Sequence, residues 1–85
     1  SIFTAQGKLE EALKMHKQEL SIYRRLTGAE SCLVAGAINS IAGDLQMQGK
    51  YDHAMEKFEE AHAMYRRIYG DDHPKVGMVL SNMGN

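Results

Sequence analysis

The sequence has few of the residues that support cross-links, thiolate metal sites or membrane spans. Cys32 is its one cysteine, so an internal disulfide and a metal site with two thiolates are both excluded. No apolar run approaches the roughly 20 residues that a membrane helix needs. Basic and acidic residues nearly balance, at 10 and 11, which offers no charged surface to attract nucleic acid or an anionic membrane. We therefore expect neither as a partner.

Proline and strand-like patterns are scarce as well. Pro74 is the one proline, and no run alternates between apolar and polar residues as a half-buried strand does. Glycines instead recur every 21 residues, at Gly7, Gly28, Gly49 and Gly70, which is typical of turns between helices of similar length. With 44% hydrophobic and 25% charged residues, the composition is that of an ordinary folded domain. The sequence predicts an all-α protein.

The chain repeats itself after 42 residues. Gln6-Gly7-Lys8 aligns with Gln48-Gly49-Lys50, Tyr23-Arg24-Arg25 with Tyr65-Arg66-Arg67, and Ala12, Gly28 and Val34 with Ala54, Gly70 and Val76. These identities cluster at turns and helix ends, where structure constrains the residue type most strongly. We interpret residues 1–85 as a single segment of two periods, roughly 1–42 and 43–85.

Each period is predicted to hold a shorter and a longer helix. Apolar residues at helical spacing predict the shorter helix over 33–48 and the longer helix over 51–69. In the first period the longer helix is expected over 8–27, and a last, partial shorter helix begins at Pro74. Ser31 is a plausible helix cap, and Gly49 is expected to end the shorter helix.

Small and aromatic residues of the second period carry a family resemblance. Ala42, Gly49, Tyr51, Ala54, Phe58 and Ala61 match, in order and spacing, the pattern of the tetratricopeptide repeat. The 42-residue period and the linker over 70–76 resemble the kinesin light chain type of this repeat. The resemblance implies antiparallel helical hairpins stacked as a right-handed α-solenoid. Three residues depart from the pattern. In the first long helix His16 replaces an aromatic residue and Glu19 replaces a small alanine, and in the shorter helix Asp44 replaces an apolar residue.

The resemblance also implies where a ligand lies. In such arrays the shorter helices line a concave wall that binds peptides or protein segments. Projecting the family positions gives a peptide-binding set of Gly36, Asn39, Gly43, Gln46 and Met47, with Met78, Ser81 and Asn85 from the last helix. Amide side chains suit a peptide backbone, and the glycines leave room for close approach. None of these positions is basic, which argues against a clamp for a carboxylate.

Features of enzymes and metal proteins are lacking. No two of His16, His53, His62 and His73 have the helical spacing of a metal pair, and no glycine-rich phosphate loop follows a strand. No base can be identified that would activate Cys32 as a nucleophile. We expect no enzymatic activity, no cofactor and no metal. Of the six methionines, Met55, Met64 and Met83 fall on apolar positions and are expected in the core, whereas Met47 and Met78 are candidates for partner contact.

The function expected is that of a scaffold that binds a protein or peptide. Hairpin repeats bury their apolar faces by stacking, usually as three or more. Both ends of this chain fall within the shorter helix of the repeat, so we expect part of a longer array or end-to-end self-association. A structural segment that assembles only with itself is the alternative. RNA binding is disfavoured, since such repeats have a period of about 35 and basic inner positions. The lone cysteine suggests a cytoplasmic, intracellular protein.

Overall fold

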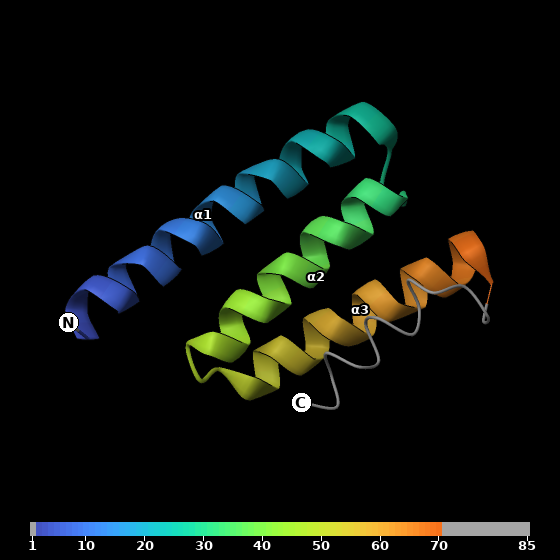
Figure 1. Ribbon diagram of the computed structural model, residues 1–85. Coiled ribbons are helices and arrows are strands. Elements are labelled where there is room, and N and C mark those ends of the chain that lie inside the picture. Colours follow the sequence, from blue (N-terminus) through green and yellow to red (C-terminus); the bar gives the residue numbers. More distant parts are fainter. Residues whose placement is uncertain (1, 71–85) are drawn as a thin grey trace.

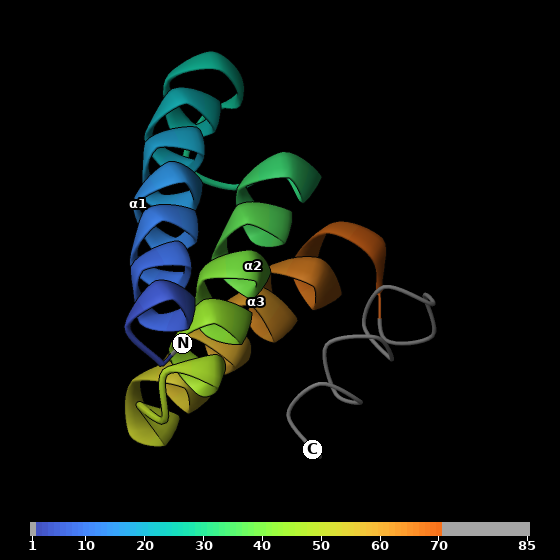
Figure 2. The same ribbon diagram turned by 60° about the vertical axis from the view of Figure 1, so that its left-hand side comes forward.

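Three consecutive α helices make up the part of the chain that the structure describes. The computed structural model describes residues 2–70, and for residues 2–6 only the backbone. The helices are α1 (Ile2–Thr27), α2 (Cys32–Met47) and α3 (Tyr51–Tyr69). They run antiparallel in sequence order, with α2 between its two neighbours, and both α1 and α3 pack against it (Figures 1 and 2). Residues 2–70 contain no strand, so the all-α prediction is confirmed.

Ser31 begins α2 as predicted. Its backbone is extended, with φ −162° and ψ 167°, and its Oγ accepts a hydrogen bond from the Val34 amide at 3.2 Å. This bond satisfies one of the amides that a helix start leaves without a partner. Thr27, the last residue of α1, is tied to the cap because its Oγ1 lies 2.7 Å from the Ser31 Oγ. The short connection therefore fixes the end of α1 and the beginning of α2 together.

Gly49 ends α2, again as the sequence predicts. Its φ of +83° is a left-handed backbone conformation that residues other than glycine rarely adopt. Two backbone hydrogen bonds close the helix end, from the Lys50 amide to the Leu45 carbonyl and from the Gly49 amide to the Gln46 carbonyl. This pair of bonds is a Schellman motif, which satisfies carbonyls that the helix end would otherwise leave free. The chain then enters α3 at Tyr51, at the predicted residue.

The turn that the repeat predicts at Gly7 is absent. α1 is one helix of 26 residues that passes through Gly7, and this glycine has no positive φ, in contrast to Gly28, Gly49 and Gly70. Residues 2–6 extend α1 at little cost, because adding a residue to an existing helix avoids the costly nucleus of a new one. Continuing α1 keeps their backbone hydrogen-bonded, at a cost of about 1 kcal/mol for the internal glycine.

The core lies along both sides of α2. Its buried members are Leu13 from α1, Val34, Ala35, Ile38, Ile41, Ala42 and Leu45 from α2, and Ala54, Phe58, Ala61, Met64 and Tyr65 from α3. Because α2 is covered from two directions, eight of its sixteen residues are buried, and they recur at helical spacing. Within residues 2–70, this leaves α2 one strip that neither α1 nor α3 covers, and this strip positions a candidate site.

A polar pair is built into the interface between α1 and α2. His16 Nδ1 lies 2.5 Å from Asp44 Oδ2, and Asp44 is the one buried charged residue of the described part, at 8% exposure. A buried carboxylate needs a donor, because an unpaired one is costly to desolvate. The two departures from the repeat pattern thus contact each other. The partner of His16 comes from the next helix, 28 residues further along the chain.

Candidate functional site

The uncovered strip of α2 carries the predicted binding residues. Gly36, Asn39, Gly43 and Gln46 are half-buried and Met47 is 71% exposed, whereas the buried residues of α2 face α1 and α3. Their spacing of three, four and seven residues keeps them on one side of the helix. We call these five residues the open face of α2. Met78, Ser81 and Asn85, the other predicted members, lie outside the described residues.

The glycines of the open face differ in the space around them. A Cβ added at Gly43 would meet nothing within 4 Å, so this position is a notch in the helix surface. A Cβ at Gly36 would lie 3.4 Å from the Tyr65 hydroxyl, which reaches over from α3. Asn39 is less available than expected, since its Oδ1 is buried and accepts no hydrogen bond from the described residues. Gly43 is therefore the clearest point at which another chain can approach the backbone.

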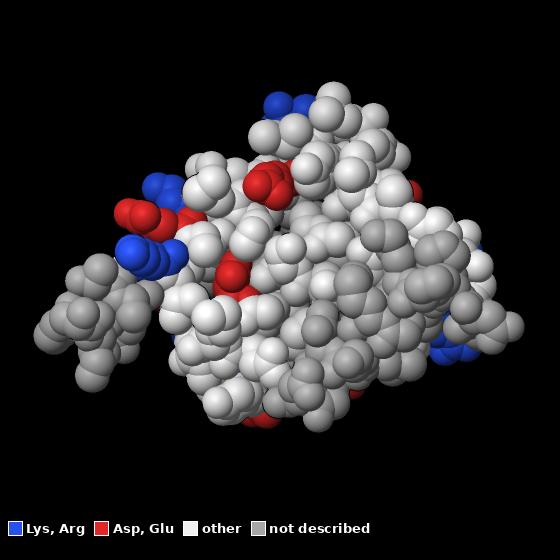
Figure 3. All heavy atoms as spheres, in the orientation of Figure 1, with Lys and Arg blue, Asp and Glu red and all other residues white. Residues whose placement is uncertain are grey.

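The open face is uncharged. α2 contains no lysine or arginine, and its one acidic residue, Asp44, is paired with His16 on the side that faces α1. The space-filling view shows basic side chains at the margins of this side of the molecule and a few acidic side chains nearer its middle (Figure 3). Recognition on such a surface rests on apolar contact and amide hydrogen bonds, because no cation is present to bind a carboxylate.

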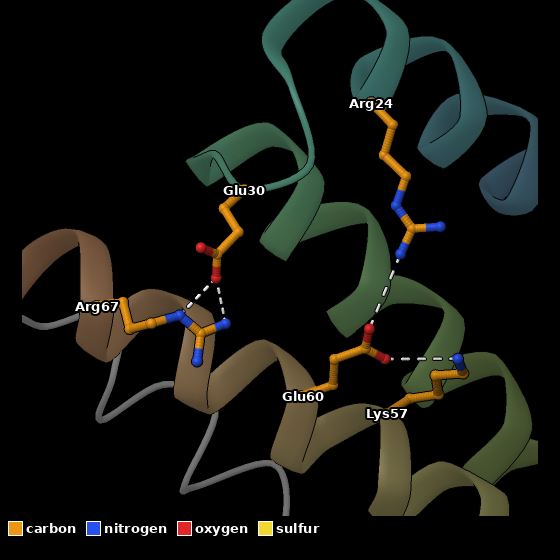
Figure 4. A network of polar contacts seen from close by, with 5 residues as sticks. All are labelled: Arg24, Glu30, Lys57, Glu60 and Arg67. Carbon is orange, nitrogen blue, oxygen red and sulfur yellow. Dashed lines mark hydrogen bonds and ion pairs between the residues drawn. The ribbon is translucent and has the colours of Figure 1, made fainter.

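Several basic side chains of the long helices form ion pairs instead. Arg67 of α3 hydrogen-bonds Glu30 in the α1–α2 connection, with 2.5 Å between Nε and Oε1. Arg24 of α1 and Lys57 of α3 both reach Glu60, at 3.8 Å and 3.5 Å (Figure 4). All these side chains are at least 40% exposed, so each pair contributes little to stability. These paired basic side chains thus lie on a solvated surface outside the open face of α2.

A groove borders the open face, and the sequence analysis did not assign it a role. It has a volume of about 350 Å³ and is lined by Glu19 and Tyr23 from α1, by Leu33, Gly36 and Ser40 among others from α2, and by Tyr65. Glu19 was noted only as a departure from the repeat. The sequence does contain a signal for the groove. Glu19 is acidic, whereas the equivalent residue of the second period, 42 positions later, is Ala61.

Cys32 and two tyrosines meet at the beginning of α2. The rings of Tyr65 and Tyr69 stack with centroids 6.0 Å apart. Burial raises the pKa of Tyr65, and a hydrogen bond with Cys32 is the main cause that raises the pKa of Tyr69. Both hydroxyls therefore stay protonated and neutral at physiological pH. The cluster thus adds no charge to the uncharged surface of α2.

The described residues hold no group of three or more histidine, cysteine or carboxylate side chains placed to bind a metal ion. None of the helices within residues 2–70 combines the length and the hydrophobicity that crossing a membrane requires.

Among the methionines, Met64 is buried as predicted, but Met55 is 41% exposed, because it lies away from the side of α3 that packs on α2. Met83 and Met78 lie beyond the described part. Met47 has the exposure that partner contact needs.

Comparison with known proteins finds one matching family and two effector relatives. A family model described as "Tetratricopeptide repeat" matches residues 1–31 and 34–75. The RxLR effector protein SFI4 of Phytophthora infestans (strain T30-4) is 31% identical over 70 residues, which cover 82% of this chain and 21% of the relative. The secreted RxLR effector protein RXLR-C07 of Plasmopara halstedii is 34% identical over 56 residues, which cover 66% of this chain and 17% of the relative. The chain thus spans about a fifth of the length of these curated relatives.

These relatives contradict the cytoplasmic localisation that the lone cysteine suggested. Both are RxLR effector proteins, and the one from Plasmopara halstedii is named as secreted. The expectation failed for a physical reason. Helical repeats are held together by apolar packing along their length, so they need no disulfide in any compartment, and a low cysteine content then says little about where the protein works.

Proposed function

Because the chain belongs to the tetratricopeptide repeat family, whose repeats generally mediate protein–protein interaction, we propose that it binds a peptide or protein segment on the open face of α2. The role is that of a scaffold surface and not of a catalyst. The bound segment is neutral or apolar where it crosses α2, and it contacts the backbone closely at Gly43. Met47 and Gln46 contact it at the end of the helix, and Asn39 contributes amide hydrogen bonding.

The observation that carries this proposal is the notch at Gly43 on an uncharged strip. A helix surface that is merely solvated has no need for two glycines, each of which costs roughly 0.5–1 kcal/mol of helix stability relative to alanine. Gly43 has open space above it, so no neighbour within the described chain requires its small size. Close approach of a ligand backbone is a physical reason for glycine at such a position.

The wider setting that we propose is a secreted effector protein in which this segment is one part of a longer array. The similarity to two effector proteins supports it, as does the small share of their length that the chain spans. The 42-residue period supports a repeat of the kinesin light chain type. The uncharged open face distinguishes the proposed ligand from acidic motifs, which would need cations opposite them.

Gly43→Leu tests the binding role directly. Peptides selected from a random display library against the native chain serve as probes, and titration calorimetry measures their affinity for each variant. Leucine at position 43 fills the notch without meeting a neighbour, so the helices remain folded while the affinity falls by about tenfold or more. Ser21→Leu adds the same side chain to the exposed outer side of α1 and leaves the affinity unchanged. Equal affinities for the native chain and Gly43→Leu would refute the proposal.

A further inference from the structure

The exposed sides of the two long helices carry opposite charges at equivalent positions. Residues three, four and seven apart share one side of a helix, and two such stripes lie 42 residues apart in the sequence. The α1 ridge consists of Glu10, Lys14, Lys17 and Ser21, and the α3 ridge consists of Asp52, Glu56, Glu59 and Ala63. Ala63 is half-buried, and the other side chains of both ridges are exposed. Two lysines on α1 thus correspond to two glutamates on α3.

Neighbouring hairpins do not cover the charged positions of the ridges. Each hairpin of a repeat array contacts the one before it and the one after it. α1 has a following long helix, α3, and α3 has a preceding one, α1. The same repeat positions are exposed in both helices. Their exposure therefore belongs to the repeat itself and persists beside a further hairpin on either side.

The lysines and glutamates of the ridges are free to pair with another molecule. Within residues 2–70, Lys14, Lys17, Glu56 and Glu59 form no ion pair or side-chain hydrogen bond. The charged side chains beside them are paired within the chain, as Figure 4 shows for Glu60. A groove of about 370 Å³ runs along α1, and all four residues of the α1 ridge line it. The groove gives an opposing row of side chains room to enter.

The spacing of the two ridges matches when the helices run antiparallel. Along α1 the ridge advances by four, three and four residues, and the α3 ridge read backwards does the same. A parallel alignment would set Glu10 against Asp52, and like charges placed opposite each other repel. The antiparallel alignment has no like-charged pair. It sets Lys14 opposite Glu59, Lys17 opposite Glu56, Ser21 opposite Asp52 and Glu10 opposite Ala63.

We propose that the α1 ridge binds the α3 ridge of a second copy of the chain in this antiparallel register. The contact joins unlike surfaces, so it is heterologous and can continue from copy to copy. Exposed ion pairs contribute at most about 1 kcal/mol each, so the association is weak and decreases with added salt. It does not involve the open face of α2. It is therefore independent of the function proposed above, and Gly43→Leu leaves it intact.

Paired charge reversals test the proposal. Lys14→Glu with Lys17→Glu makes both ridges acidic, and Glu56→Lys with Glu59→Lys makes both basic. Sedimentation velocity at rising protein concentration, in a buffer of low salt, measures association of the 85-residue chain. The native chain associates, and each variant alone associates about tenfold more weakly or not at all. An equimolar mixture of the two variants associates again, because each provides the ridge that the other needs.

A matched control separates the ridges from net charge. Lys8→Glu with Lys50→Glu changes the net charge as much as the first variant does, at exposed equivalent positions outside both ridges, and it associates as the native chain does. A native chain that stays monomeric would overturn the proposal, as would a mixture that stays monomeric. Association that survives Lys14→Glu with Lys17→Glu would assign the contact to another surface and would also overturn it.

Discussion

At the scale of single residues, the informative positions are those that break the repeat. His16 and Asp44 each look unfavourable alone, as a histidine in place of an aromatic and as a carboxylate in an apolar face. The structure brings them within 2.5 Å of each other across α1 and α2, so one departure compensates for the other. Glu19 has no such partner in the described part of the chain, and it lines the groove beside the open face of α2.

The pair predicts strong coupling in a double-mutant cycle. His16→Phe restores the aromatic of the repeat but leaves Asp44 buried without a donor, at a cost of about 2–3 kcal/mol. Asp44→Leu costs less, about 1 kcal/mol, because His16 is more exposed and can bind water. The double variant is within about 1 kcal/mol of the native chain or more stable, since an apolar pair of similar volume replaces the polar one. Urea unfolding of the four proteins gives the coupling energy, and additive effects would disprove the pairing.

At the scale of the helices, identical residues adopt different structures in the two periods. Gln48-Gly49-Lys50 turns the chain, whereas Gln6-Gly7-Lys8 continues a helix. The turn at Gly49 follows from the packing of α2. α2 is a helix of 16 residues that packs against both neighbours, so ending it and turning back into α3 buries its apolar side.

Alanine at the two glycines distinguishes these structures. Gly7→Ala stabilises the chain by roughly 0.5–1 kcal/mol, because α1 passes through a helical Gly7 and the new Cβ meets nothing within 4 Å. Gly49→Ala destabilises it by about 1 kcal/mol, because alanine is strained at the φ of +83°. Thermal unfolding followed by circular dichroism measures both changes. A loss of stability in Gly7→Ala would mean that Gly7 ends a helix as Gly49 does.

At the scale of the whole molecule, α2 is the central helix and its neighbours are not equivalent. α3 uses Ala54, Phe58 and Ala61 to pack closely on α2. α1 packs on α2 around Leu13, and Ile22, the counterpart of the buried Met64, is 49% exposed. Equivalent positions of the two periods therefore differ in burial. The same substitution is expected to change the free energy of unfolding by different amounts in the two periods.

Exchanging the residues at positions 19 and 61 measures this asymmetry. Ala61→Glu introduces an unpaired charge at a fully buried position and destabilises the chain by about 3 kcal/mol or more. Glu19→Ala changes the stability by less than about 1 kcal/mol, since nothing in the described chain depends on the carboxylate. Urea denaturation monitored by tyrosine fluorescence provides both values. Comparable destabilisation by the two changes would show that position 19 is packed as closely as position 61.

The sequence alone determined the helical class, the bounds of α3 and the turn at Gly49, because these depend on local spacing, capping and glycine conformation. The resemblance to the tetratricopeptide repeat predicted Gly36, Asn39, Gly43, Gln46 and Met47 as one set, and their spacing places them on one side of a helix. The tertiary structure decided the rest. It paired His16 with Asp44, buried the oxygen of Asn39, carried α1 through Gly7 and placed Glu19 at a groove beside α2. These outcomes depend on which helices pack together, and residue spacing within one helix contains no information about its neighbours.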